Sequence, residues 1–217
     1  MLLRTNVYDA IRAEILSCRF APGEDMREQD LAARYEVSRQ PVREALLRLE
    51  QDRLVTVLPR QGYRVNPISI TDARDLLQMR LLLEPACGRE VCATATAAQL
   101  AAFDSFRALG AAREFITYNR DFHVAVCNAC GNRRMARATR EIIEQSDRLT
   151  RVSLDSIRGR DSAQLVAEHG AIIDALQARD ARRAASLLRD HITRAKRRIM
   201  AALSRAAIIA EIPGVSS

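Results

Sequence analysis

Alternating apolar residues of the kind that form β-strands occur in one short stretch of this chain, and the pattern after it is helical. In "LVTVLPRQGYRVNP", two valines alternate on one side of a Pro-Arg-Gln-Gly tip, and Tyr63 and Val65 alternate on the other. Such a stretch predicts a β-hairpin. From Ser69 onward, apolar residues recur at helical spacing instead. We therefore expect a mainly α protein in which one hairpin closes a small first domain.

Pro67 marks the expected boundary between two domains. Residues 1–67 combine three short helical patterns with the hairpin, an order that predicts a winged helix-turn-helix. Residues 68–207 contain one helical repeat after another and predict an all-α antiparallel helical bundle. The expected helices of this bundle are about 70–95, 97–109, 111–130, 133–156, 162–178 and 180–205. Residues 208–217 are expected to form a loose tail.

Composition and charge narrow the classes of protein to consider. The 217 residues contain no apolar run long enough to span a membrane, and the charged N-terminus does not have the pattern of a signal peptide. The five irregularly spaced cysteines are then expected to be reduced thiols in a cytoplasmic protein. The formal net charge of +7 permits an anionic partner such as nucleic acid, without requiring one.

The third helical pattern, "SRQPVREALLRLE", separates an apolar face from a polar one. Four apolar residues between Val42 and Leu49 fall at helical spacing and predict a buried stripe. The first-turn side chains point away from that stripe and suit base edges and phosphates in a major groove. The expected DNA contacts are Ser38, Arg39, Gln40 and Arg43 of this helix, with Arg60, Gln61 and Gly62 at the hairpin tip. An ordinary solvated face would show the same periodicity, and local charge does not decide between the two interpretations.

The segment "FAPGEDMREQDLAARYEVSRQPVREALLRLEQDRLV", followed by "RQGYRV", closely resembles the DNA-binding domain of the GntR family of bacterial transcription regulators. The resemblance covers about residues 7–66 and implies a homodimer that binds a palindromic DNA operator. It also implies that Arg39 and Arg43 are the main DNA contacts, with Gln40 and Gly62 near bases or backbone. The chain departs from the family at Cys18 and Arg53, where the family often has glycine, and both departures put the local turn geometry in question.

The chain has only three histidines, His123, His169 and His191, and each shares a helical face with apolar residues. Three imidazoles that project into one bundle interior can converge on a metal ion, because neutral imidazole is the commonest protein ligand of metals. Three separate core histidines, each with its own hydrogen bond, are the alternative that the pattern leaves open.

The segments "LLQMRLLLEPA", "YNRDFHVAVCNACGN", "AEHGAIIDAL" and "RRAASLLRDHI" resemble the FCD domain, the ligand-binding domain of FadR-type GntR regulators, over about residues 70–205. The resemblance implies a divalent metal, zinc before nickel or manganese, held by the three histidines and by Asn119, four residues before the first of them. Asp121 is excluded on geometry, because residues two apart on a helix point about 200° apart. The implied metal ligands are Asn119, His123, His169 and His191.

A small carboxylate effector is expected beside the metal. Neutral ligands would leave the ion's double positive charge uncompensated, which favours an anion. Arg80 lies on the inward face of its helix and offers a fork for a carboxylate, although Glu84, four residues on, is an equally plausible structural partner. Ser146 is the other expected effector contact, with a hydrogen bond to its own helix backbone as the alternative.

Together these patterns predict a cytoplasmic, metabolite-responsive transcription regulator, expected to be a repressor and not an enzyme. The alternative is a three-histidine metal-dependent hydrolase, since such an ion can activate water. A hydrolase needs a general base near the metal, and no HExxH-type arrangement occurs. Glu168, beside His169, is expected to face elsewhere on its helix.

Overall fold

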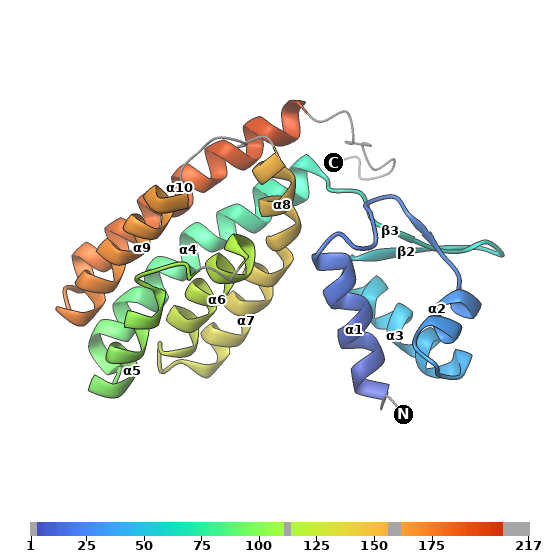
Figure 1. The fold of residues 1–217 in the computed structure, drawn as a ribbon, viewed down its shortest axis with the longest axis horizontal. Helices are drawn as coiled ribbons and strands as arrows, with labels where there is room; N and C mark the ends of the chain where they lie inside the picture. The colour runs from blue at the N-terminus through green and yellow to red at the C-terminus, as the bar shows by residue number, and fades with distance from the viewer. Residues whose placement is uncertain (1–3, 111–113, 156–161, 206–217) are drawn as a thin grey trace. The chain divides into compact units, whose positions relative to one another are not determined.

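A computed structural model of the chain describes residues 4–110, 114–155 and 162–205 (Figure 1). The predicted tail, residues 208–217, lies outside the described residues. Two compact units divide the chain, one ending at Ser69 and the other beginning at Ile70. Each unit is described by itself. Among the helices of the described ranges, none is long and apolar enough to cross a membrane.

The first unit is a winged helix-turn-helix of three helices and a small sheet. Its elements are α1 (Arg4–Leu16), β1 (Asp25–Met26), α2 (Glu28–Arg34), α3 (Arg39–Gln51), β2 (Val55–Leu58) and β3 (Gly62–Val65). The predicted hairpin is confirmed: β2 and β3 pair antiparallel, with Val55 opposite Val65 and Leu58 opposite Gly62. Strand β1 was not predicted from the sequence. It pairs with β3 and gives the order β1-β3-β2. A strand of two residues is too short to show alternation in a sequence.

The core of this unit forms where α1 and α3 pack on the sheet. The predicted stripe of α3 is confirmed, since Val42, Ala45, Leu46 and Leu49 are all buried. They share one apolar cluster with α1 and with the hairpin residues Val55, Tyr63 and Val65. Burial of this stripe fixes the rotation of α3 and therefore turns its polar face outward.

Cys18 and Arg53, the two departures from the family pattern, both adopt the left-handed conformation that glycine favours. Their φ angles are +54° and +57°. The amide of Arg53 still donates to the Glu50 carbonyl at 2.9 Å, and that of Cys18 donates to the Ile15 carbonyl at 3.0 Å. The turns therefore keep their geometry, at a conformational cost of about 1–2 kcal/mol for each non-glycine residue.

The second unit is entirely helical in the residues that the structure describes. Its elements are α4 (Ile70–Thr94), α5 (Ala97–Ala102), the 3-10 helix η1 (Phe103–Phe106), α6 (Phe115–Asn128), α7 (Arg133–Gln145), α8 (Asp147–Asp155), α9 (Ser162–Gln177) and α10 (Ala181–Arg205). The two 25-residue helices, α4 and α10, pack along each other (Figure 1). Cys87, Phe122, Cys127 and Leu188 are among the residues of its apolar core.

Three of the predicted helices of this unit have different bounds, and the one expected at 111–130 spans Phe115–Asn128. The helix expected at 97–109 ends at Ala102 and continues as a 3-10 turn. The helix expected at 133–156 is two helices, because Ser146 caps the end of α7 and α8 begins at Asp147. The Ser146 hydroxyl donates to the Ile142 carbonyl at 2.8 Å, a contact that competes with the backbone ladder and bends helices.

Candidate functional site

The first turns of α3 present polar side chains on the surface opposite the core. Ser38, Arg39, Gln40 and Arg43 are all exposed. Ser38 occupies the predicted N-cap position with an extended backbone, but its hydroxyl caps no N–H of the helix. Neighbouring side chains of α2 hold both arginines: Arg43 pairs with Glu28, and Arg39 donates to Gln29. The face is thus exposed and cationic, and contacts with α2 partly fix the positions of its two arginine side chains.

The tip of the hairpin is a tight turn that exposes Arg60 and Gln61. The amide of Gln61 donates to the Leu58 carbonyl at 2.9 Å, and Arg60 and Gly62 both have positive φ, +65° and +113°. A Cβ atom on Gly62 would lie 2.5 Å from the Met26 carbonyl oxygen, so only glycine fits there. The geometry explains why this tip needs its glycine, while its contact with DNA stays a prediction.

The three histidines of the second unit come together in one buried cluster. His123 on α6, His169 on α9 and His191 on α10 each offer a ring nitrogen within 4.8 Å of the other two. His123 and His169 are 0% exposed and His191 is 3% exposed. The Nε2 atoms of His123 and His191 lie 3.3 Å apart. The alternative of three separate core histidines is therefore wrong.

A polar partner on the far side of each ring sets its orientation. The Nδ1 atom of His123 lies 2.5 Å from Glu84 Oε2, and the Nδ1 atom of His191 lies 2.6 Å from Glu168 Oε2. Carboxylates of this kind fix the ring and leave Nε2 as the basic nitrogen. Both rings therefore present Nε2 toward the shared centre.

His169 reaches the same orientation through a tyrosine. Its Nδ1 atom lies 3.2 Å from the Tyr118 hydroxyl, which donates its own proton to the Phe106 carbonyl at 2.6 Å. The imidazole must then donate from Nδ1, because the tyrosine has no second proton to give. The Nε2 atom of His169 is buried and has no hydrogen-bond partner. A bare, buried lone pair is costly unless something binds it.

Burial keeps two of the three imidazoles in the neutral state that metals bind. Burial, with the charges of the neighbouring histidines, lowers the pKa of His169 well below its usual value, and burial lowers the pKa of His191 to about 4. Burial alone would raise the pKa of Glu84, but the charges of Arg80 and His123 outweigh it and bring the pKa to about 2. At neutral pH, His169 and His191 are thus neutral while Glu84 is ionised.

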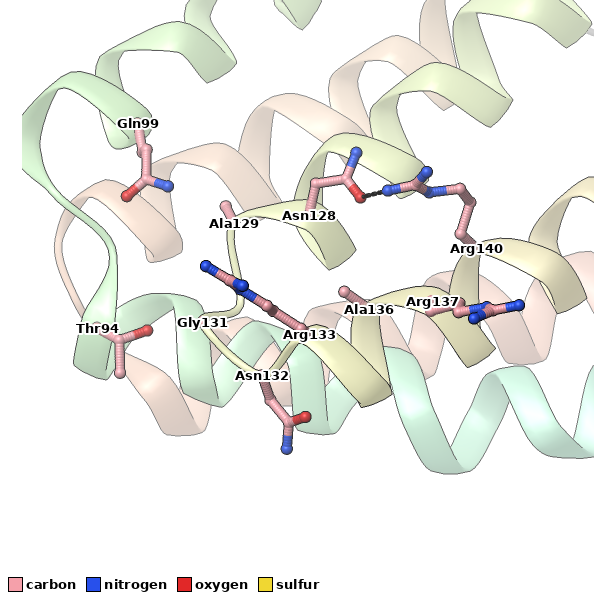
Figure 2. A pocket seen from close by; sticks show the side chains of 10 residues that line it. All are labelled: Thr94, Gln99, Asn128, Ala129, Gly131, Asn132, Arg133, Ala136, Arg137 and Arg140. Carbon is pink, nitrogen blue, oxygen red and sulfur yellow. Dashed lines mark hydrogen bonds between the residues drawn. The ribbon is translucent and has the colours of Figure 1, made fainter.

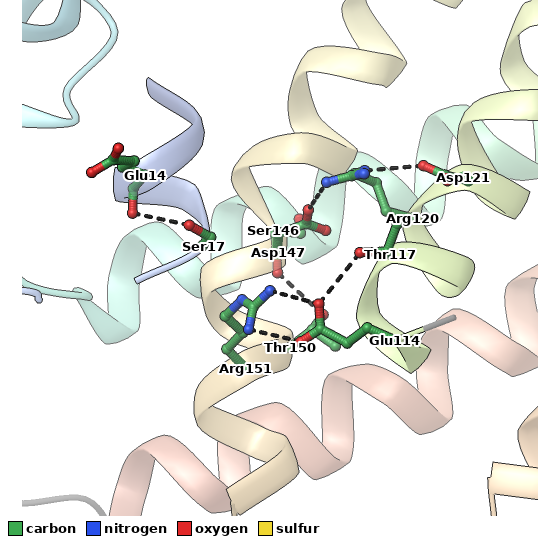
Figure 3. A network of polar contacts seen from close by, with 10 residues as sticks. All are labelled: Glu14, Ser17, Glu114, Thr117, Arg120, Asp121, Ser146, Asp147, Thr150 and Arg151. Atoms are coloured by element: carbon green, nitrogen blue, oxygen red, sulfur yellow. Dashed lines mark hydrogen bonds and ion pairs between the residues drawn. The ribbon is translucent and has the colours of Figure 1, made fainter. Parts of the chain in front are cut away.

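The residues present fit a divalent ion. Two imidazole nitrogens bound to one tetrahedral zinc at the usual bond length lie about 3.4 Å apart, close to the 3.3 Å between His123 and His191. Asn119, the implied fourth ligand, lines a small cavity of about 30 Å³ together with His123 and His191. Asp121 is turned elsewhere, as its helical position predicts, and its carboxylate accepts from Arg120 at 3.2 Å (Figure 3).

Arg80 and Ser146, the two expected effector contacts, lie in different surroundings. Arg80 lines the cavity beside His123, and its Nε atom donates to Glu84 Oε1 at 2.5 Å in a fully buried ion pair. Ser146 is not among the residues that line the cavity, and its hydroxyl donates to the backbone of its own helix. Arg80 is thus paired with Glu84 and also lines the cavity.

A larger hollow of about 520 Å³ lies at the start of α7 (Figure 2). It is lined by Thr94, Gln99, Asn128, Ala129, Gly131, Asn132, Arg133, Ala136, Arg137 and Arg140. Its three arginines are exposed, and Arg140 donates to Asn128 at 2.5 Å. It shares no lining residue with the cavity beside His123 and contains none of the predicted site residues.

Sequence reasoning missed three residues that orient the histidines: Glu84, Tyr118 and Glu168. Only Glu84 had a local signal, because a carboxylate four residues after a buried arginine faces the same way. Glu168 faces away from the shared centre, as expected, but its contacts with His191 and Arg194 were not predicted. Contacts between separate helices leave no spacing signal in the sequence.

Known proteins match both units. Residues 3–65 match the family described as bacterial regulatory proteins, gntR family, and residues 75–194 match the FCD domain. The HTH-type transcriptional regulator BphR of Paraburkholderia xenovorans is 33% identical over 198 residues, which are 85% of this chain and 80% of that protein. The HTH-type transcriptional repressor RspR of Escherichia coli is 36% identical over 93 residues, 43% of this chain and 41% of that protein.

The crystal structure of a GntR transcriptional regulator from Rhodococcus sp. RHA1 matches with a TM-score of 0.77 at 27% identity, covering 91% of this chain and 97% of that one. A winged helix followed by a helical ligand-binding domain defines a class of bacterial DNA-binding transcription regulators. Within that class, the chain belongs to the GntR family and carries an FCD domain. The family and these relatives are regulators, not enzymes.

Proposed function

We propose that this regulator is a metal-containing repressor whose affinity for its operator changes when a small organic acid binds to the FCD domain. The observation that carries the proposal is the buried Nε2 atom of His169, which has no partner and belongs to a cluster with His123 and His191. The relative RspR of Escherichia coli is a transcriptional repressor. The regulator would act in the cytoplasm as a homodimer on a palindromic operator.

The metal would be a divalent ion held by Asn119, His123, His169 and His191, with zinc before nickel or manganese. Three imidazoles with oriented Nδ1 atoms support this assignment. The ion would supply a fixed positive charge and an exchangeable coordination position. Each nearby carboxylate already has a cationic partner, Arg80 for Glu84 and Arg194 for Glu168. The positive charge of the ion would thus remain available to an anion.

The effector would be a small mono- or dicarboxylate. Glu84 occupies Nε of the Arg80 guanidinium, and the two terminal nitrogens on the other edge of that group are the ones we assign to the effector. A cavity of about 30 Å³ has room for little more than one water molecule. A carboxylate would therefore have to displace the walls around it, which include Thr150 of α8 and Ala195 of α10. Such a displacement is a means of coupling the ligand to the rest of the chain.

The DNA-binding surface would consist of the polar face of α3 and the tip of the hairpin. Arg39 and Arg43 would contact base edges or phosphates, with Ser38 and Gln40 beside them. Arg60, Gln61 and Gly62 would reach the backbone or the minor groove. All of these but Gly62 are exposed, as a docking face requires.

A hydrolase finds no support in the arrangement of the carboxylates. Glu84 and Glu168 both lie behind the imidazole rings, against Nδ1 atoms, and both are paired with arginines. A general base must lie within hydrogen-bond reach of the water that it activates. Neither carboxylate faces the side on which a metal-bound water would lie.

Two measurements test the proposal. Purified chain never exposed to chelator should contain about one divalent ion per protomer, and His169→Ala should lose it. A DNA duplex enriched from a random library should bind the wild type, and Arg39→Ala and Arg43→Ala should each weaken that binding by about 10-fold. The absence of metal in the wild type would overturn the metal site. Unchanged DNA affinity in both arginine variants would overturn the docking surface.

A further inference from the structure

Glu28, the first residue of α2, holds the guanidinium of Arg43 through both carboxylate oxygens. Arg43 Nε donates to Glu28 Oε1 and Arg43 Nη2 donates to Glu28 Oε2, each at 2.8 Å. The hydroxyl of Tyr63, on β3, donates to the same carboxylate at 3.3 Å. Three elements therefore meet at this carboxylate: the start of α2, the exposed face of α3 and strand β3 of the hairpin.

The edge of the guanidinium that Glu28 occupies determines which edge remains for a ligand. A guanidinium is planar and has two pairs of parallel N–H groups, one on its side (Nε and Nη2) and one at its end (Nη1 and Nη2). Glu28 takes the side pair. The end pair matches the two acceptors of a guanine, O6 and N7. The side chain of Arg43 is 55% exposed, so that edge is accessible.

Arg39, the other arginine on this face, is held far less firmly. It makes one hydrogen bond, from Nη2 to the amide oxygen of Gln29 at 3.1 Å. That contact is with a neutral amide, and Glu28 attracts Arg39 only through space, so this side chain is less constrained than Arg43. Arg39 and Arg43 thus differ in constraint, although a sequence shows them as equivalent cations.

We propose that Glu28 is a positioning residue for base recognition, holding Arg43 by its side edge so that its end edge reads a guanine. The inference rests on the proposed docking of α3 in DNA. The arrangement has two opposing effects. Fixing the side chain before binding removes rotamer entropy that base recognition would otherwise cost. The charge of Glu28 also repels phosphates, which lowers affinity for DNA of any sequence.

The measured quantity is the ratio of affinities for two DNA duplexes. One is a duplex enriched by the wild-type chain from a random-sequence library, and the other has the same composition with scrambled half-sites. Glu28→Gln should bind the scrambled duplex several-fold more tightly and should lower the ratio by roughly 10-fold. Its affinity should also fall more steeply with salt, because a released Arg43 can neutralise a phosphate.

Glu28→Asp separates positioning from charge. Aspartate keeps the negative charge, but its side chain is one methylene shorter and does not reach both N–H groups from the same backbone position. The ratio should fall, while the affinity for scrambled DNA should stay near that of the wild type. Thermal unfolding of each variant shows whether the domain remains folded. The affinity ratio is compared with that of the wild type for each variant that keeps the wild-type melting temperature.

Glu14→Gln is a matched control. Glu14 on α1 pairs with Arg34 on α2, and the two side chains are 14% and 50% exposed, compared with 19% and 55% for Glu28 and Arg43. The control removes one carboxylate from a similar ion pair between helices without touching α3. Its ratio should match that of the wild type.

The double variant Glu28→Gln with Arg43→Lys tests whether the effect passes through Arg43. Lysine keeps the charge but has no fork, so Glu28→Gln should no longer change the ratio once Arg43 is replaced. The inference is overturned if Glu28→Gln leaves the ratio unchanged or if Glu14→Gln lowers it equally. If the wild type enriches no sequence at all, the proposed DNA-binding surface fails, and the inference fails with it.

Discussion

The hydroxyl of Tyr118 lies 3.2 Å from Nδ1 of His169, and this contact decides which nitrogen of the imidazole faces the other two histidines. The same hydroxyl donates to the Phe106 carbonyl, so the orientation of the ring is tied to the 3-10 turn that ends before α6. This buried tyrosine thereby helps to organise the candidate metal centre.

Tyr118→Phe should weaken metal binding by about 10-fold or more, because loss of an orienting hydrogen bond has an effect of that size on metal sites. The ring remains, so packing is kept and the stability of the metal-free chain should fall by only about 1 kcal/mol. Competition against a chromophoric chelator measures the affinity. A variant that holds zinc as tightly as the wild type would show that Tyr118 has no orienting role.

Asn119→Asp should make the chain retain its metal more tightly, since a carboxylate is a stronger ligand of a divalent ion than an amide oxygen. Dissociation of the ion into excess chelator should slow by about 10-fold, and the rise in melting temperature on adding metal should increase. Asp121→Asn is the matched control, because that carboxylate lies two residues away and pairs with Arg120. Equal effects from both variants would mean that position 119 is not a ligand.

The hairpin, the buried stripe of α3 and the inward faces of the histidines could all be predicted, because each depends on periodicity within one segment. The rest depends on how segments pack. Glu168 reaches His191 on another helix at 2.6 Å, and no spacing along the chain encodes that contact. The two-residue strand β1 exists only because β3 offers it a partner at Tyr63 and Arg64. The break at Ser146 was not predicted, although the hydrogen bond from its hydroxyl to its own helix backbone was one of the two alternatives for that residue.

Arg80→Lys should abolish the response to carboxylates while leaving the fold intact. Arg80→Ala is the wrong test, because it would leave Glu84 as a buried charge without its arginine, a change that costs about 3–5 kcal/mol. Lysine keeps the charge beside Glu84 but has no second edge for an effector. A thermal-shift panel of small mono- and dicarboxylates compares the two proteins. A variant that responds like the wild type would rule out Arg80 as the effector contact.

Asp147 makes the stability of the second unit depend on pH in a direction unusual for a carboxylate. Burial raises its pKa to about 6, although Arg120 opposes the shift through an ion pair at 3.2 Å (Figure 3). A raised pKa means that the folded chain favours the protonated form. The stabilising contribution is therefore complete below about pH 4, the unfolded pKa, and is lost as the pH rises to about 6.

Asp147→Asn should remove that dependence. The melting temperature of the wild type relative to the variant should fall between pH 4 and pH 7, because asparagine stays neutral throughout. Asp121→Asn removes the other carboxylate that pairs with Arg120, and it separates loss of that ion pair from loss of the buried carboxyl group. A constant difference between wild type and Asp147→Asn across this range would contradict the assignment.

Arg53→Gly should stabilise the winged helix. The residue is exposed and has a φ of +57°, a conformation that costs a side-chain-bearing residue about 1–2 kcal/mol and costs glycine almost nothing. The greater freedom of glycine in the unfolded chain offsets part of the gain, about 0.4–1 kcal/mol. The net increase in the free energy of unfolding should be about 0.5–1 kcal/mol, measured by urea denaturation. Arg53→Ala is the control, because it removes the side chain beyond Cβ and keeps the strain. If alanine stabilises as much as glycine, the backbone conformation is not the cause.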